Sequence, residues 1–242
     1  MTRVIIKASD VAAIVGKNKF KPVEEVFNEL WKKYSPENFN SKTKLDMAEE
    51  ALNKSEAAKD IFRETSAKRA KTSSEAQDNF KEAEAKINSD TTLSEEDKKR
   101  VIEHVRSKVY TEHGINKEDE TARRTGLDLK RDETFYKLHI GEFNDREYVI
   151  VGRVDRIETL PDGTQILVEI KNRTKKLFYQ VYPSEMVQLQ VYLEMLNLDK
   201  AKLVEQYNSQ VNTMHVERDR KMFEEIFKGL EDFCFRLSQV ML

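Results

Sequence analysis

The sequence predicts an α/β (α+β) protein in which helices flank a mixed central β-sheet and a further helical region is inserted. The first observation is a pair of β-branched segments, residues 148–158 and 164–171, joined by a Pro161-Asp162-Gly163 turn that predicts a β-hairpin. The second is the helical spacing of the apolar residues in 183–196. The third is a shift to Ala, Glu, Lys, Ser and Asp in residues 41–91, where narrow apolar stripes predict lightly packed helices.

The N-terminal part of the chain predicts a series of helices. Residues 5–16 predict a short apolar helix with a Ser-Asp cap at its start and a glycine at its end. Residues 22–34 carry an amphipathic stripe behind a proline, which suits the first turn of a helix. Within residues 41–91, Thr72-x-x-Glu75 is a capping box that predicts the start of another helix.

The remaining elements follow from the same helical and strand-like periodicities. In chain order the patterns predict a helix from Ser94, a helix over residues 112–124 that ends near Gly126, a strand over residues 135–140, the hairpin, a helix over residues 183–196, strands over residues 202–207 and 211–216, and a C-terminal helix capped by Asp219. This mixture of strands and helices is typical of a sheet covered by helices.

Composition excludes several classes of protein. A single cysteine among 242 residues excludes an internal disulfide framework and a cysteine-based zinc site. The four histidines lack a metal-ligand spacing, and the seven glycines form neither a phosphate-binding loop nor a dinucleotide-binding fingerprint. The absence of a secretory signal and of a long apolar run predicts a soluble, intracellular protein without a membrane partner.

The net charge restricts how this chain can meet a polyanion. A formal charge of −2 provides no attraction over long distances, so a DNA-binding surface has to be a local basic patch. The candidates are two groups of basic residues, one after the hairpin and one near the N-terminus: Lys171, Arg173, Lys175 and Lys176, and Lys17, Lys19 and Lys21.

Asp155, Glu169 and Lys171 are the strongest candidates for a catalytic site. Because side chains alternate along a strand, Glu169 and Lys171 share one face of the second hairpin strand, and Asp155 lies on the strand paired with it. Carboxylates are the ligands of hard cations such as Mg²⁺, and an ammonium beside them can hold a water molecule. The pattern indicates phosphodiester cleavage, although a charged strand face is also compatible with simple solvation.

Two predicted helices carry further polar candidates. Gln188 and Tyr192 are four residues apart and therefore point the same way from one helix. Glu118 and Glu120 place carboxylates on the helix that precedes the hairpin. Both pairs are equally compatible with ordinary positions at the surface or the edge of the core.

With these motifs in this order, the chain resembles the PD-(D/E)XK nuclease superfamily, and within it the YqaJ, RecB-nuclease and lambda exonuclease branch. That branch has a Gly-x-x-x-Glu helix, a strand Asp, a Glu-x-Lys strand and a Gln-x-x-x-Tyr helix. The corresponding motifs here, within residues 111–216, are Gly114…Glu118, Asp155, Glu169-Ile170-Lys171 and Gln188…Tyr192. The resemblance implies a restriction-endonuclease-like fold.

The resemblance also implies a Mg²⁺ site in which Mn²⁺ is expected to substitute. Asp155, Glu169 and the carbonyl of Ile170 would hold the cation, and Glu118 would complete the site. Lys171 would position and help to activate the attacking water. The expected products carry 5′-phosphate and 3′-hydroxyl groups.

One departure from the family pattern leaves the helix carboxylate open. In the family an alanine follows the helix glutamate by three residues, whereas Ala122 follows Glu118 by four. Glu120 therefore remains an alternative to Glu118.

Contacts with DNA are the last implication for individual residues. The expected DNA-binding residues are Gln188, Tyr192, Arg173, Lys175 and Ser9. Ser9 lies in an Ala-Ser segment that resembles the opening of YqaJ-type exonucleases, where the serine helps to hold the 5′-phosphate of a DNA end. A serine before an apolar helix is also an ordinary N-cap.

The sequence thus predicts one nuclease domain over residues 1–242, with a helical insertion at about 41–91 and a catalytic core at about 111–216. The predicted function is metal-dependent 5′ to 3′ cleavage of DNA ends in recombination, repair or viral or phage replication, with a single-strand annealing or replication protein as expected partner. The alternatives are an endonuclease of the same fold, a non-catalytic DNA- or partner-binding protein, and a scaffold whose 41–91 helices make homo-oligomer or partner contacts.

Overall fold

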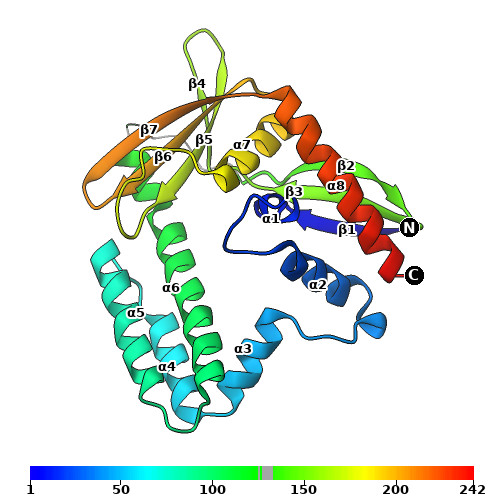
Figure 1. Cartoon of the computed structure of the whole chain (residues 1–242). Helices are drawn as coiled ribbons and strands as arrows, with labels where there is room; N and C mark the ends of the chain where they lie inside the picture. The colour runs from blue at the N-terminus through cyan, green and yellow to red at the C-terminus, as the bar shows by residue number, and fades with distance from the viewer. Residues whose placement is uncertain (125, 127–132) are drawn as a thin grey trace.

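A computed structural model of the protein describes residues 1–124, 126 and 133–242 and contains two mixed β-sheets with helices around them (Figure 1). The first sheet has the strand order β1-β3-β2, and the second has the order β4-β5-β6-β7. The strands are β1 (Thr2–Lys7), β2 (Tyr136–Phe143), β3 (Arg146–Gly152), β4 (Arg156–Thr159), β5 (Gln165–Asn172), β6 (Lys200–Tyr207) and β7 (Gln210–Glu217). In each sheet one pair is parallel, β1 with β3 and β5 with β6, which confirms the mixed α/β class.

The predicted first strand of the hairpin is divided between the two sheets. Residues 146–152 form β3 in one sheet, and residues 156–159 form β4 in the other, where they pair antiparallel with β5. The expected turn is present, since the amide of Leu160 donates to Thr164 and that of Gly163 donates to Leu160. The expectation of a single central sheet was wrong, because the chain leaves the first sheet after Gly152 and begins new pairing at Arg156, after three intervening residues.

The described helices agree with the predicted pattern except in two places. They are α1 (Val11–Ile14), α2 (Val23–Tyr34), α3 (Lys44–Asn53), α4 (Glu56–Ala67), α5 (Ser73–Asn88), α6 (Glu95–Arg124), α7 (Pro183–Leu196) and α8 (Arg220–Val240), with short 3-10 turns η1 (Ala8–Asp10) and η2 (Pro36–Asn38). The helices predicted from Ser94 and over 112–124 are one continuous helix, α6. Two of the expected caps are present, since Thr72 accepts from the amide of Glu75 and Asp219 accepts from that of Met222, whereas the Ser-Asp cap expected for the first helix is absent.

The second difference lies at the N-terminus. Residues 5–7, predicted as part of a helix, belong to β1, which pairs with β3 through the parallel register Ile5↔Val149. Helical structure begins only at Ala8 and ends with α1 at Ile14, and Gly16, with a positive φ of 68°, lies in the turn that follows. The buried alternation of Val4 and Ile6 against β3 explains why these apolar residues form a strand.

The core is divided between the sheets and the helical region. The main core joins residues of both sheets to α1, α2, α7 and α8, and α8 packs across β2 (Figure 1). A separate apolar cluster lies among α3, α4, α5 and the first half of α6. A third, small cluster of Ala122, Val168, Ile170 and Val204 joins the end of α6 to β5 and β6. The division of the chain into an insertion and a catalytic core stays a prediction.

Within the described ranges, no helix has both the length and the apolar character that crossing a membrane requires.

Gly152 is the point where the first sheet meets α7 and the N-terminal segment. A Cβ atom at this position would lie 2.5 Å from Cε1 of Tyr192 and 2.8 Å from Cβ of Ala8. Only glycine therefore allows the backbone of β3 to approach the Tyr192 ring this closely. The contact places η1, which begins at Ala8, beside α7.

We expect Gly152→Ala to lower the free energy of unfolding by about 1–3 kcal/mol, because the added methyl group overpacks a contact that has no free space. Urea denaturation followed by circular dichroism measures the change. Gly114→Ala is the matched control, since no atom lies within 4 Å of the Cβ that it would add in α6. The control should be unchanged or stabilised by about 0.5–1 kcal/mol. Equal stability of Gly152→Ala and wild type would contradict the close packing of Tyr192.

Candidate active site

Asp155 lies in the short connection between β3 and β4, at the edge of β5. Its Oδ2 accepts a hydrogen bond of 2.7 Å from the backbone amide of Ile170. The β4–β5 pairing begins one residue later, at Arg156 opposite Val168. The carboxylate thus takes a backbone donor just beyond the end of the ladder, and this contact holds Asp155 next to Glu169.

Glu169 and Lys171 project from β5 on the same face, as the strand alternation predicts. Glu169 is 5% exposed, and its Oε1 accepts a hydrogen bond of 2.7 Å from Nζ of Lys171. Its second oxygen, Oε2, is buried and has no hydrogen-bond partner among the described residues. A carboxylate oxygen buried in this way is costly unless a cation or a proton satisfies it.

The pKa values at this cluster follow from burial and from neighbouring charges. Burial raises the pKa of Asp155, and the Glu118 carboxylate raises it further. Burial and the Asp155 carboxylate raise the pKa of Glu169 to about 7. Burial works to lower the pKa of Lys171, but the carboxylates of Glu169, Asp155 and Glu185 together outweigh it and raise that pKa to about 12. Lys171 is therefore an ammonium at neutral pH, between carboxylates that repel each other.

Three consecutive acidic residues at the end of α6 have three different neighbourhoods. Glu118 is close enough to Asp155 to raise the pKa of that group. Asp119 forms a salt bridge with Nη2 of Arg156, a residue that is 2% exposed. Glu120 pairs with Lys117 and with Arg124, which holds the pKa of Glu120 below its usual range. Glu118 is thus the helix carboxylate that faces Asp155.

Glu120 lines a different part of the molecule. With Lys117 and Arg124 it borders a cavity of about 290 Å³ that also includes His113 and the first turn of α5. Neither Asp155 nor Glu169 lines this cavity.

The α7 pair extends the cluster by two contacts. Nζ of Lys171 donates to Oε1 of Gln188 at 3.3 Å, and Nε2 of Gln188 donates to Oη of Tyr192 at 3.4 Å. Tyr192 is 4% exposed, and burial raises its pKa to about 12, so its phenol stays protonated. Glu169, Lys171, Gln188 and Tyr192 therefore form one hydrogen-bonded row.

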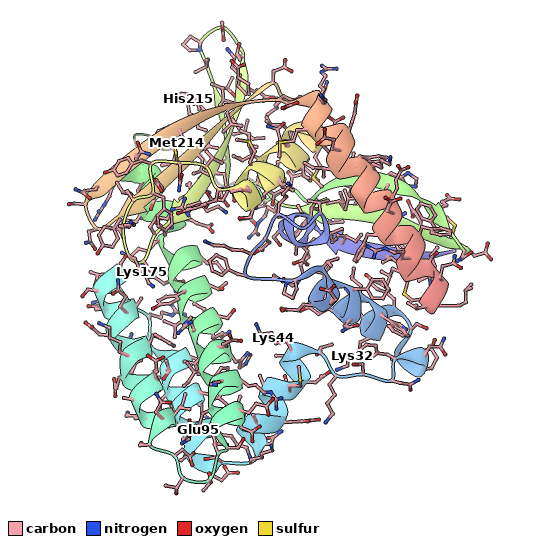
Figure 2. The ribbon with its side chains drawn as sticks, viewed as in Figure 1. Lys32, Lys44, Glu95, Lys175, Met214 and His215 are labelled. Carbon is pink, nitrogen blue, oxygen red and sulfur yellow. The ribbon has the colours of Figure 1, made fainter. Side chains whose placement is uncertain are left out.

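The remaining expected DNA contacts have unlike surroundings. Ser9 is exposed in η1, directly after Ala8, and its side chain caps neither η1 nor α1. Lys175 is exposed on the loop after β5, beside the N-terminal end of α5 (Figure 2). Arg173 is committed to two carboxylates, with Nε 2.9 Å from Glu205 and Nη1 2.6 Å from Glu185. Its contact with DNA stays a prediction.

Two ion pairs that position the site were not predicted from the sequence. Arg156, next to Asp155, binds Asp119 and so ties the end of α6 to β4. Arg173 ties β5 to α7 through Glu185. No spacing along the chain connects these partners, because each pair joins elements that are distant in sequence.

The donor set fits a hard divalent cation. In the described parts of the chain, no three or more His, Cys, Asp or Glu residues are already arranged to enclose a metal ion. The oxygens of Asp155 and Glu169, the Ile170 carbonyl and Glu118 are nevertheless the ligand type that Mg²⁺ and Mn²⁺ take. The unpartnered Oε2 of Glu169 and the mutual repulsion of the carboxylates are both relieved by a positive ion.

Comparison with known proteins assigns the chain to a family. The family model of the PD-(D/E)XK nuclease superfamily matches residues 23–239. No curated protein matches the sequence. Similar solved structures include a phage-related exonuclease from Haemophilus somnus 129PT, at 12% identity over 99% of this chain and 97% of that chain with a TM-score of 0.45. Another is an alkaline exonuclease from Laribacter hongkongensis, at 14% identity over 81% of this chain and 93% of that chain with a TM-score of 0.41.

We expect divalent metal binding to weaken as the pH falls through about 7. Glu169 has a pKa of about 7 without metal, so at lower pH the ion has to displace its proton. The affinity for Mn²⁺ should be about tenfold lower at pH 6 than at pH 8, with proton release on binding. Isothermal titration calorimetry in buffers of different ionisation enthalpy measures both quantities. Equal affinity at both pH values, without proton release, would mean that Glu169 is not a ligand.

Proposed function

Because the chain belongs to the PD-(D/E)XK nuclease superfamily, we propose that it is a divalent-metal-dependent deoxyribonuclease that cleaves DNA from its ends in the 5′ to 3′ direction. Recombination, repair or viral or phage replication are the processes that need such an activity. The observation that carries the proposal is the group of Asp155, Glu169 and Lys171, in which Glu169 is buried and its Oε2 has no partner among the described residues. Fixed negative and positive groups of this kind are what metal-assisted phosphodiester hydrolysis requires.

In this proposal Asp155, Glu169 and the Ile170 carbonyl hold Mg²⁺, and Glu118 completes the site. The cation supplies Lewis-acid polarisation of the phosphoryl oxygen and stabilises the developing negative charge. In the proposal Glu169 binds the metal through Oε2 and keeps its contact with Lys171, because only Oε1 is bound to the ammonium.

Lys171 acts as a hydrogen-bond donor in the proposed reaction. With a pKa of about 12 the amine keeps its proton at neutral pH, so it does not serve as a general base. Its ammonium instead orients the attacking water and stabilises the hydroxide that develops from it. Gln188 fixes the ammonium from α7, and Tyr192 fixes the Gln188 amide.

A group of unpaired lysines around the site supports DNA as the substrate. Lys7, Lys17, Lys19, Lys175 and Lys176 are exposed and form no salt bridge with any residue that the structure describes. The net charge of −2 gives no attraction over long distances, so in the proposal these lysines supply the local positive surface that DNA requires. The proposed path of the phosphate backbone runs between the two lysine groups, past Lys171.

The proposed preference for DNA ends depends on Ser9. Its hydroxyl is exposed and is not used as a helix cap, and its segment lies against Tyr192 through Ala8. In the proposal this hydroxyl binds the terminal 5′-phosphate.

We expect purified protein to degrade linear duplex DNA in Mg²⁺ or Mn²⁺ and to leave closed circular DNA intact. Asp155→Ala should lower the rate by on the order of 10³-fold or more, because a cation ligand that stabilises the transition state is lost. Ser9→Ala should remove a preference for 5′-phosphorylated over 5′-hydroxyl ends. Gel assays with end-labelled substrates measure all three effects.

Each outcome of this assay separates one alternative. Cleavage of closed circles at the rate of linear DNA would leave an endonuclease of the same fold. Binding of DNA without cleavage in either metal would leave a non-catalytic DNA-binding protein. Undiminished cleavage by folded Asp155→Ala would overturn the site assignment.

We expect Glu118→Gln to lower cleavage by about 10²-fold and Glu120→Gln to change it by less than about twofold. The reason is that Glu118 is close enough to Asp155 to raise its pKa, whereas Glu120 pairs with Lys117 and Arg124. These three residues line the cavity next to His113. The two isosteric variants are matched controls for each other, since they lie two residues apart on one helix. The opposite order of effects in a steady-state cleavage assay would make Glu120 the functional carboxylate.

A further inference from the structure

The loop of residues 173–182, between β5 and α7, holds an exposed tyrosine in a strained backbone conformation. Tyr179 has a φ of 55° and is 67% exposed. The other non-glycine residues with positive φ in the described ranges are all Asn or Asp: Asn144, Asp145, Asn197 and Asn208. Those residue types tolerate the left-handed region, whereas an aromatic residue does so only when its surroundings impose it.

Contacts with Glu205, a fully buried carboxylate in β6, impose the left-handed conformation on Tyr179. Oε1 of Glu205 accepts the amide of Tyr179 at 2.7 Å, and both of its oxygens lie 3.1 Å from the amide of Phe178. Arg173 donates to the same carboxylate at 2.9 Å and covers the Phe178 ring with its guanidinium 4.6 Å from the ring centroid. The strain at Tyr179 is thus maintained by buried charge, while its ring is left in solvent.

These contacts place the loop on the same face of the sheet as the active-site residues. Glu205 is the register partner of Lys171 in the parallel β5–β6 pair, so their side chains share a face. Arg173 also binds Glu185, which lies one turn before Gln188 on α7. From the other side, Ser73 of α5 donates to the carbonyl of Arg173 at 2.9 Å.

A second exposed aromatic ring approaches from the N-terminal part of the chain. Phe20 is 79% exposed, and Nζ of Lys19 lies 4.9 Å from its ring centroid. The same Nζ lies 5.8 Å from the ring centroid of Tyr182, at the start of α7. Tyr182 in turn packs edge to face against Phe178. Lys19 thus joins Phe20 to the loop that carries Tyr179.

Exposed aromatic rings among unpaired lysines suit one class of partner. An apolar protein surface would desolvate Lys17, Lys19, Lys175 and Lys176 at a cost, whereas a nucleic acid supplies phosphates for them. The bases of an intact duplex are stacked on each other, so only an unpaired or terminal base offers a free face to an aromatic ring. We propose that Tyr179 and Phe20 stack on unpaired bases of DNA and position a single-stranded end beside Lys171.

This inference rests on the proposed function for naming DNA as the partner, and it adds the form of DNA that the site receives. The backbone strain at Tyr179 supports this inference, because an exposed ring that served only stability would not be kept in a conformation that costs stability. Tyr179 is a positioning residue, since it acts on the substrate outside the reacting phosphate.

The test compares four variants for DNA binding in Ca²⁺ and for thermal stability. Fluorescence anisotropy is measured with a labelled single-stranded oligonucleotide and with a blunt duplex of the same sequence. Tyr179→Ala and Phe20→Ala should each weaken single-strand binding by about tenfold, and Tyr179→Phe should match wild type, because stacking needs the ring and not the hydroxyl. Phe235→Ala is the control, since this residue is 53% exposed on α8 away from the lysines.

A fifth variant separates stacking from a structural role. Tyr179→Gly should raise the melting temperature, because glycine adopts positive φ without strain, and should weaken single-strand binding as much as Tyr179→Ala does. If Tyr179 served only stability, Tyr179→Gly would instead lower the melting temperature. In Mg²⁺, Tyr179→Ala should raise KM for single-stranded DNA about tenfold and leave kcat within about twofold of wild type.

The outcomes distinguish this inference from the proposed nuclease activity. Unchanged single-strand binding by both Tyr179→Ala and Phe20→Ala, in a protein that cleaves DNA, would overturn the stacking proposal and leave the activity standing. Loss of binding in these variants, in a protein that does not cleave, would keep the stacking proposal and overturn the activity. Wild-type protein that binds neither oligonucleotide would overturn both.

Discussion

The hydrogen bond from the Ile170 amide to the Asp155 carboxylate is the contact on which the rest of the site depends. It lies where the chain passes from one sheet to the other, and it brings an acidic side chain to the edge of β5. There it meets the buried Glu169, and the Asp155 carboxylate raises the pKa of Glu169, while Glu118 raises the pKa of Asp155. Neither carboxylate is stable in this position by itself, so the ammonium of Lys171 is required to balance them.

The elements around this contact serve to hold it in place. On one side Arg156, itself almost fully buried, binds Asp119 and thereby fixes the end of α6 next to Asp155. On the other side Gln188 receives the ammonium of Lys171, and the glycine at position 152 lets β3 approach the ring of Tyr192. Groups held by packed helices and strands in this way keep their geometry before any substrate arrives, which is the condition for electrostatic stabilisation of a transition state.

The protein has no large excess of either charge, and many of its charged side chains form salt bridges. The chain has nearly equal numbers of acidic and basic residues, and Arg173, near the site, forms salt bridges with two carboxylates inside the fold. Lys19 and Lys175, in the proposed DNA path, are exposed and form no salt bridge with any residue that the structure describes. A local positive surface on a slightly acidic protein favours binding at one place and limits attachment elsewhere.

The sequence by itself determined the mixed class, the caps of α5 and α8, and the grouping of Asp155, Glu169 and Lys171. Alternation along a strand and periodicity along a helix are local, so spacing alone predicts them.

Tertiary structure decided the points that depend on contacts between distant segments. It divided the expected hairpin strand between two sheets, joined two expected helices into α6, and made residues 5–7 a strand through pairing with β3. It also turned Glu118 toward Asp155 and Glu120 away from it. Two carboxylates on one helix have the same chemistry in the sequence, and only the packing of α6 against β4 and β5 gives them different partners.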